Sequence, residues 1–132
     1  MTKATIPASH RDILDKKAYA HIATVDAKGS PQVTPVWIMT DGDTLIINSA
    51  RGRKKDRNLS DRPDQLAISI QDPDNPYRYI GMQAKVVEVT EEGADDVIHA
   101  LSMKYGGKRY TLNPNEQRVT YKIEPTRVWT MG

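Results

Sequence analysis

The most informative part of the sequence is the twelve-residue stretch Asn48–Leu59, which reads NSARGRKKDRNL. Five of the chain's 19 lysine and arginine residues fall within seven positions of it, beside a single acidic residue. The apolar residues 44–47 before it predict a β-strand, and residues 56–61 predict a short helix that Pro63 ends. A strand that leads into a basic loop and a helix N-terminus brings backbone N–H groups, a helix dipole and cationic side chains together. The stretch therefore predicts an anion site, with a solvated basic turn as the alternative.

Length and composition limit the classes of protein to which the chain can belong. Its 132 residues predict one domain over residues 1–132, and 38% hydrophobic with 27% charged residues is typical of a soluble protein. The absence of cysteine excludes disulfides, thiolate nucleophiles and cysteine-based metal sites. No apolar run approaches the ~20 residues of a membrane span, and the N-terminus lacks a signal-peptide pattern, so we expect a cytoplasmic protein without a membrane span.

The charge distribution favours a small anionic ligand. The net charge is only +2, and much of the positive charge lies in residues 51–57. A long polyanion would need a wider basic surface, so we expect no nucleic-acid partner. The histidines His10, His21 and His99 are too far apart in sequence to show metal-ligand spacing, and no metal site is expected.

The pattern of apolar residues and turn signals predicts a mainly β protein with short helices. Alternation and β-rich composition predict six strands, with mostly antiparallel connections, at residues 19–25, 32–39, 44–49, 65–71, 77–89 and 117–131. Three short helices are expected at residues 9–17, 56–61 and 93–105. Pro35 indicates a bulge or an edge strand, and Gly81 indicates a bend. Small antiparallel sheets of this kind remove their edges by closing into barrels.

Four stretches in this order resemble the split β-barrel oxidoreductases related to pyridoxamine 5′-phosphate oxidase, which bind flavin or deazaflavin. They are the opening hairpin IATVDAKGSPQVTPVW (residues 22–37), the second hairpin DGDTLIINS (41–49), the phosphate element RKKDRNL (53–59) and the closing strand VTYKIEPTRVW (119–129). The likeness spans residues 18–131. It implies a homodimeric, six-stranded antiparallel split β-barrel of the FMN-binding, pyridoxine-phosphate-oxidase-like type.

Within that family the chain looks most like the short, single-barrel branch that uses coenzyme F420, a deazaflavin. This likeness implies a homodimer whose two cofactor sites lie at the subunit interface, with the cofactor phosphate near the basic loop. It also implies hydride transfer between the reduced deazaflavin and a small conjugated electrophile, with no protein acid or base required. FMN is the alternative cofactor, because no residue in the sequence separates the two. A protein that only binds and sequesters a flavin or deazaflavin is a further alternative.

The resemblance assigns roles to the basic stretch residue by residue. Arg53 and Lys55 match the family's phosphate ligands, and Lys54 between them would offer its backbone N–H. Asn58 is either a ligand or a residue held by the loop backbone. The two remaining arginines, Arg51 and Arg57, either meet a second anionic group or face solvent.

The remaining candidates lie on the strands. Pro35, Val36 and Trp37 are where the resemblance places the cofactor ring, although Trp37 could equally be a core residue. Asn48 and Ser49 end the third strand, where their polar groups could reach a phosphate or the edge of the ring.

Two tyrosines at the start of the long strand complete the predicted site. The family pattern places Tyr77 and Tyr79 across the dimer interface, where Tyr77 could cover a ring bound mainly by the other subunit. Plain interface packing is the alternative for both.

Overall fold

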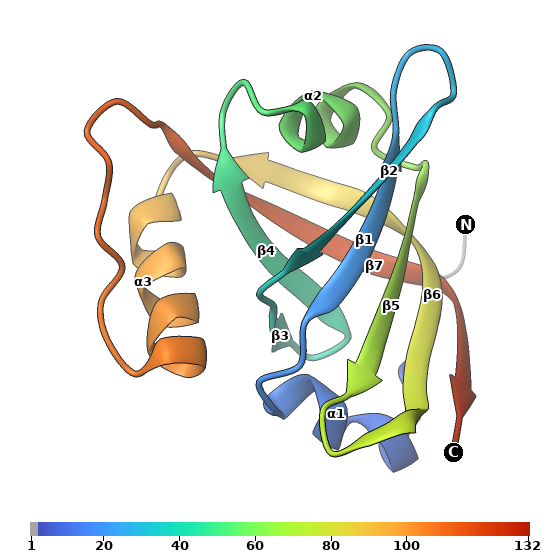
Figure 1. The fold of residues 1–132 in the computed structure, drawn as a ribbon. Helices are drawn as coiled ribbons and strands as arrows, with labels where there is room; N and C mark the ends of the chain where they lie inside the picture. Colours follow the sequence, from blue (N-terminus) through green and yellow to red (C-terminus); the bar gives the residue numbers. More distant parts are fainter. Residues whose placement is uncertain (1–2) are drawn as a thin grey trace.

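One antiparallel sheet organises the computed structural model, which describes residues 3–132 (Figure 1). Over these residues the sheet has seven strands in the order β2-β1-β5-β6-β7-β4-β3. The strands are β1 (Ala20–Val25), β2 (Pro31–Val36), β3 (Met39–Asp41), β4 (Thr44–Ala50), β5 (Leu66–Asp72), β6 (Asn75–Thr90) and β7 (Arg118–Met131). The helices are η1 (Ala8–His10), α1 (Asp12–Asp15), α2 (Lys54–Asp61) and α3 (Ala94–Gly106). No helix in residues 3–132 combines the length and apolar character needed to cross a membrane.

The predicted mainly β, antiparallel fold is confirmed, but the number of strands was wrong. The expected strand at residues 32–39 is interrupted after Val36 and resumes at Met39 as β3. The backbone of Ile38 is hydrogen-bonded by side chains of α3: its N–H donates to Tyr105 Oη at 3.1 Å, and its carbonyl accepts from Lys104 Nζ at 2.7 Å. Because helix side chains take these positions, the chain leaves the ladder and one predicted strand becomes two.

The sheet curls round on itself without closing. In residues 3–132, β2 and β3 are the two edge strands and no ladder pairs them. Only two residues separate these edges along the chain, so the sheet must bend until its edges approach each other (Figure 1). Pro35 lies in the edge strand β2, as its missing N–H predicts. The structure contains one chain, and the homodimer therefore stays a prediction.

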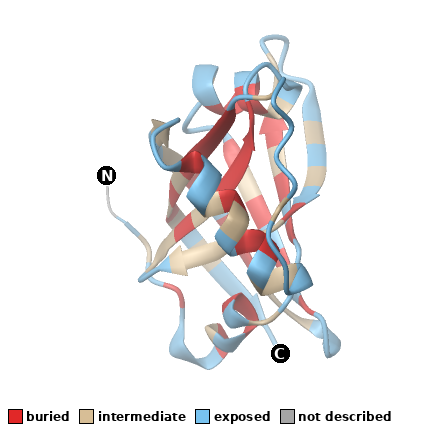
Figure 2. Cartoon of the chain, turned by 90° about the vertical axis from the view of Figure 1, so that its left-hand side faces the viewer, coloured by how far each residue is buried: buried red, intermediate tan, exposed pale blue. Residues whose placement is uncertain are grey.

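The core fills the inside of the curl. Strand β5 shows the pattern, because Leu66, Ile68 and Ile70 are buried while the residues between them are half-buried or exposed. Figure 2 shows buried residues along the strands and exposed residues concentrated in the loops and on the outer faces of the helices. Fully burying a side chain of this size contributes roughly 1.5–3 kcal/mol to stability.

Gly81 is a point of close packing in β6, and no register irregularity of the sheet falls at it. It pairs in regular register with Ser69 and Trp129, and the register irregularities along β6 lie on either side of it, one opposite Gln71/Asp72 and two at Gln83/Ala84 and Val86/Glu88. A Cβ atom at Gly81 would lie 2.1 Å from the indole nitrogen of Trp129. The glycine is therefore needed to make room for the indole ring.

The basic stretch lies at one end of the sheet, between β4 and α2 (Figure 1). The last residue of β4, Ala50, is paired with Arg118 at the start of β7, and Arg51 N–H donates to Gln117 O at 2.8 Å. This pairing fixes the loop beside the segment that enters β7. Helix α3 packs along β4 and β7 on the same side of the molecule (Figure 1).

Candidate functional site

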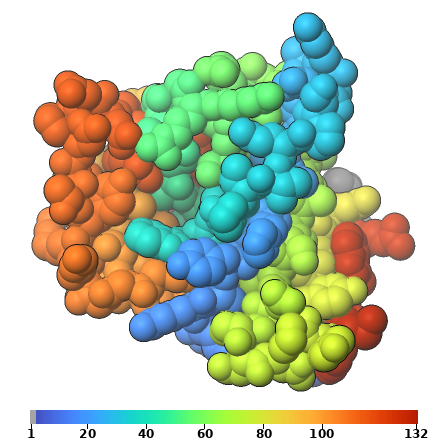
Figure 3. Space-filling model, viewed as in Figure 1, coloured from blue at the N-terminus to red at the C-terminus, as the bar shows by residue number. Residues whose placement is uncertain are grey.

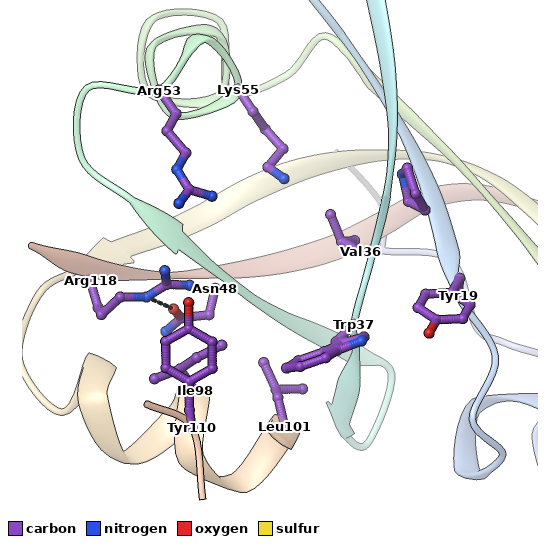
Figure 4. Close-up of a pocket in the computed structure, with 11 residues that line it drawn as sticks. Tyr19, Val36, Trp37, Asn48, Arg53, Lys55, Ile98, Leu101, Tyr110 and Arg118 are labelled. Carbon is purple, nitrogen blue, oxygen red and sulfur yellow. Dashed lines mark hydrogen bonds between the residues drawn. The ribbon is translucent and has the colours of Figure 1, made fainter. Parts of the chain in front are cut away.

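A pocket of about 200 Å³ lies between α3, the start of α2 and the segment that joins β2 to β3. Figure 3 shows the hollow where α3 and the loop after it meet the basic stretch. Its lining falls into two parts (Figure 4). One end is cationic and polar, with Arg53, Lys55, Arg118, Asn48 and Tyr110. The other end is mainly apolar and aromatic, with Tyr19, Pro35, Val36, Trp37, Ile98 and Leu101.

The cationic end concentrates positive charge in one place. Arg53 is the residue before α2, Lys55 lies in its first turn, and both side chains extend from α2 into the pocket that Arg118 also lines (Figure 4). Burial lowers the pKa of Lys55 below its usual value, and the nearby charges of Arg53 and Arg118 lower it further. Within residues 3–132 no carboxylate forms a salt bridge with Lys55, and no side chain caps the N-terminus of α2. An anion placed here would relieve the repulsion and meet backbone N–H groups at the helix end.

Arg118 is held rigidly beneath this cluster. It is only 4% exposed, and its Nε donates to Asn48 Oδ1 at 2.9 Å. The amide of Asn48 is fixed in turn, because its Nδ2 donates to Ala94 O at 2.9 Å and to Thr120 Oγ1 at 3.2 Å. The ring of Tyr110 lies over the guanidinium, with 5.2 Å from its centroid to Cζ. Asn48 therefore lines the pocket and also orients Arg118.

The apolar end presents a flat aromatic wall. The rings of Trp37 and Tyr105 are stacked, with centroids 5.4 Å apart and planes 13° from parallel. Tyr105 is anchored because its Oη donates to Ala18 O at 2.6 Å and accepts the Ile38 N–H at 3.1 Å. Burial raises the pKa of Tyr105, which keeps its hydroxyl protonated as a donor. A planar ring placed against this wall would gain apolar contact without any change of the wall's shape.

A buried carboxylate keeps the basic loop in shape. Asp56 accepts hydrogen bonds from Gly52 N–H at 3.0 Å, from Arg51 Nη1 at 3.2 Å and from Tyr121 Oη. Arg57 donates to the Gly52 carbonyl, and Gly52 has the positive φ of 88° that favours glycine. Burial, with the neighbouring Asp56 adding to it, raises the pKa of Tyr121 far above its usual range. The side chains of Arg51 and Arg57 thus bind their own chain, and contact with a cofactor tail remains a prediction.

The structure brings six of the eleven predicted site residues together, and they are Pro35, Val36, Trp37, Asn48, Arg53 and Lys55. Lys54 lies next to them in sequence, but its side chain lies 3.8 Å from Asp26 Oδ2. Its backbone N–H is in the first turn of α2, where a phosphate contact remains a prediction.

Two further predicted residues are buried behind the pocket. Asn58 donates to Thr24 Oγ1 at 3.0 Å and accepts from Arg62 Nη2 at 3.3 Å, so these bonds of its amide are to side chains and not to the loop backbone, and its role as a ligand stays a prediction. Ser49 is buried, and its hydroxyl has no hydrogen-bond partner among residues 3–132.

Tyr77 and Tyr79 lie near the start of β6, and Figure 1 shows that this end of the strand is remote from α2. Tyr77 is 82% exposed and Tyr79 is half-buried. Neither lines the pocket of its own chain, so their contribution to a site across a dimer interface stays a prediction.

Five lining residues were not predicted from the sequence, and they are Tyr19, Ile98, Leu101, Tyr110 and Arg118. The helical periodicity of residues 93–105 places Ile98 and Leu101 on one face, but it does not say what that face contacts. Arg118 carries no local signal at all. Only the pairing of β7 with β4 brings it beside the basic loop.

Comparison with known proteins identifies the family. A family model described as pyridoxamine 5′-phosphate oxidase matches residues 6–132, almost the whole chain. This chain belongs to the pyridoxamine 5′-phosphate oxidase family. The resemblance inferred from the four sequence motifs is therefore confirmed. Membership of the family, together with the pocket, supports an oxidoreductase-like function with a flavin-type cofactor.

Solved structures of the same fold include one relative with clear sequence similarity. An F420 reductase is 31% identical to this chain, with a TM-score of 0.84, and the match covers 94% of this chain and 98% of the reductase. No curated protein sequence matches.

Two more distant structures share the fold alone. The HupZ protein of Group A Streptococcus is 22% identical with a TM-score of 0.71, and the match covers 96% of this chain and 94% of HupZ. General stress protein 26 of Bacillus anthracis is 16% identical with a TM-score of 0.71, and the match covers 92% of this chain and 90% of that protein.

Proposed function

We propose that this protein binds coenzyme F420 and is an oxidoreductase that transfers a hydride between this deazaflavin and a small conjugated electrophile. The observation that carries the proposal is that one and the same pocket has a cationic end and, at the other end, the flat ring of Trp37 stacked on Tyr105. A molecule that joins a planar ring to a phosphate matches both ends of the pocket. The 31% identity to an F420 reductase favours the deazaflavin. When bound, the coenzyme supplies the hydride chemistry.

The residues at the cationic end bind and orient the phosphate. Arg53, Lys55 and Arg118 can each donate to its oxygens, together with the first backbone N–H groups of α2. Charge-assisted hydrogen bonds of this kind contribute roughly 1.5–3 kcal/mol each. Because Arg118 is held by Asn48, this guanidinium loses little freedom when the anion binds.

The residues at the apolar end orient the ring and exclude water. Val36 and Trp37 form one side of the space, and Ile98 and Leu101 of α3 form the other (Figure 4). The part of the lining that the structure describes contains no carboxylate and no imidazole. This suits a reaction in which solvent supplies the proton and the protein contributes binding and position.

FMN is the second candidate cofactor. It also joins a planar ring to a phosphate, and the family model that matches this chain is that of pyridoxamine 5′-phosphate oxidase. The two readings are separated by mixing purified protein with coenzyme F420 or FMN and following the quenching of cofactor fluorescence. Tighter binding of FMN would replace the first proposal by the second.

Lys55→Ala tests the phosphate assignment. We expect cofactor affinity to fall by about tenfold or more, because one charge-assisted contact is lost. The control is Lys54→Ala, which keeps the backbone N–H and removes only a side chain near Asp26; its affinity should stay within about twofold. Equal affinities for the two variants would show that the phosphate lies elsewhere.

A turnover assay separates catalysis from sequestration. Reduced coenzyme F420 is mixed with the protein and a panel of conjugated carbonyl and nitro compounds, and its reoxidation is followed by absorbance. Enzyme-dependent reoxidation supports the proposal. Tight binding with no turnover across the panel would favour a non-catalytic binding protein.

A further inference from the structure

Glu116 lies between two of the three cations of the pocket. Its Oε1 accepts from Arg53 Nη2 at 2.9 Å, and its Oε2 lies 3.4 Å from Arg118 Nη1. Both arginines line the pocket, whereas Glu116 does not. One carboxylate of this chain therefore already neutralises part of the charge offered to a ligand.

The position of Glu116 is fixed by the fold. It is the last residue of a turn in which Asn113 O accepts the Glu116 N–H at 3.0 Å and Asn113 Oδ1 accepts the Asn115 N–H at 2.9 Å. Two residues later the chain enters β7, where Arg118 is paired with Ala50 at the end of β4. The same strand pairing that brings Arg118 to the basic loop therefore brings Glu116 with it.

The charge of Glu116 opposes the ligand that its neighbours attract. With Lys55 protonated, the three cations and this carboxylate leave a formal charge of +2 on the cluster. The Glu116 side chain is 26% exposed and that of Arg118 is 5% exposed, so solvent screens their field only in part. Repulsion between Glu116 and a bound anion grows in proportion to the anion's charge.

We propose that Glu116 determines which anion the pocket prefers, by disfavouring a doubly charged phosphate monoester relative to a singly charged phosphodiester. This inference rests on the proposed function, since it concerns the phosphate end of the same pocket. It gives a physical basis for a preference between the two candidate cofactors, because the phosphate of coenzyme F420 is a diester and that of FMN is a monoester.

The variant Glu116→Gln tests this role, because it keeps the shape and one acceptor and removes the charge. The probes are inorganic phosphate at pH 8, mainly a dianion, and dimethyl phosphate, a monoanion. Binding is followed at low salt through the arginine Nε–H signals in ¹⁵N NMR spectra. We expect the affinity for phosphate to rise about tenfold and that for dimethyl phosphate about threefold, since the repulsion scales with charge.

Glu91→Gln is the matched control. Glu91 also accepts from an arginine of the basic stretch, Arg51 Nε at 2.8 Å, but Arg51 does not line the pocket. The affinities of the Glu91→Gln variant for phosphate and for dimethyl phosphate should stay within about twofold of the wild-type values. An unchanged or weaker affinity in Glu116→Gln, an equal gain for both probes, or no binding by either protein would overturn the inference.

Titration with FMN and coenzyme F420 then separates this inference from the proposed function. The wild-type preference for coenzyme F420 over FMN should fall in Glu116→Gln. If neither cofactor binds while phosphate shows the expected gain, the proposed function is wrong and the role of Glu116 stands. If both cofactors bind but the preference and the phosphate affinity stay unchanged, the proposed function stands and the role of Glu116 is wrong.

Discussion

At the scale of single residues, Lys55 is the group whose protonation responds most directly to a ligand. Its pKa in the folded chain is lowered by burial and then by Arg53 and Arg118. Folding therefore disfavours the charged form, and this unfavourable contribution to stability fades as pH rises through the lowered pKa toward the usual Lys value of 10.5. A bound anion has the opposite effect, because it favours the protonated amine.

The pH dependence of cofactor binding follows from this shift. We expect affinity to fall as pH rises from neutral through the lowered pKa of Lys55, because the neutral amine no longer attracts the phosphate. In Lys55→Arg the guanidinium stays charged, so the fall attributable to residue 55 should disappear. Fluorescence titrations of both proteins between pH 7 and 10 measure the difference. Parallel curves for the two proteins would contradict the role of Lys55.

At the scale of elements, α3 forms one wall of the pocket. Its side chains also hydrogen-bond backbone groups of segments that lie outside the sheet. Lys104 Nζ donates to Leu14 O and Ile38 O, each at 2.7 Å, and Tyr105 Oη bonds Ala18 O and the Ile38 N–H. Burial lowers the pKa of Lys104. These bonds satisfy backbone groups that would otherwise need a neighbouring strand. The end of α3 therefore fixes the segment that carries Trp37.

Tyr105→Phe tests this anchoring. The substitution keeps the ring that stacks on Trp37 and leaves Ile38 N–H and Ala18 O without their partner. We expect the free energy of unfolding to fall by about 1–3 kcal/mol, the usual cost of unpaired buried polar groups, as measured by urea denaturation. Tyr110→Phe is the control, since the Tyr110 hydroxyl makes no hydrogen bond within residues 3–132, and its stability should change by under about 0.5 kcal/mol. Equal losses in the two variants would mean that the hydroxyl of Tyr105 is unimportant.

At the scale of the whole molecule, the outer surface of the sheet carries an apolar area suited to a second copy of the chain. Val33 is 61% exposed and Trp129 is 43% exposed. Both line a shallow hollow of about 220 Å³, together with residues of β1 and β5. Apolar side chains gathered on one face of a small domain often mark a protein interface. The predicted homodimer would cover them.

Val33→Glu tests the dimer. A charge in an apolar interface should shift the protein to the monomer, as measured by size-exclusion chromatography with light scattering. Cofactor affinity should fall with it if each site is completed by the other subunit. Met103→Glu, on the exposed side of α3, is the control and should leave the oligomeric state unchanged. A monomeric wild-type protein would contradict the prediction outright.

Local sequence was sufficient to predict most of the elements and the position of the basic stretch. Alternation of apolar residues predicted the strands, and Asp41-Gly42 predicted the turn that joins β3 to β4. The density of basic residues predicted the anion site. The basic stretch could be located because the strand, the loop and the helix N-terminus around it are contiguous in the chain, and the family resemblance then singled out Arg53 and Lys55 within it.

Pairing between distant segments supplied what local sequence could not. Arg118 and Glu116 reach the basic loop only through the register of β4 against β7, about 70 residues apart. The break after Val36 exists because Lys104 and Tyr105 bond Ile38 from more than 60 residues away. Periodicity shows which face of a segment is apolar, but the partner of that face depends on how the whole chain packs. The charge of the pocket is therefore a property of the tertiary structure.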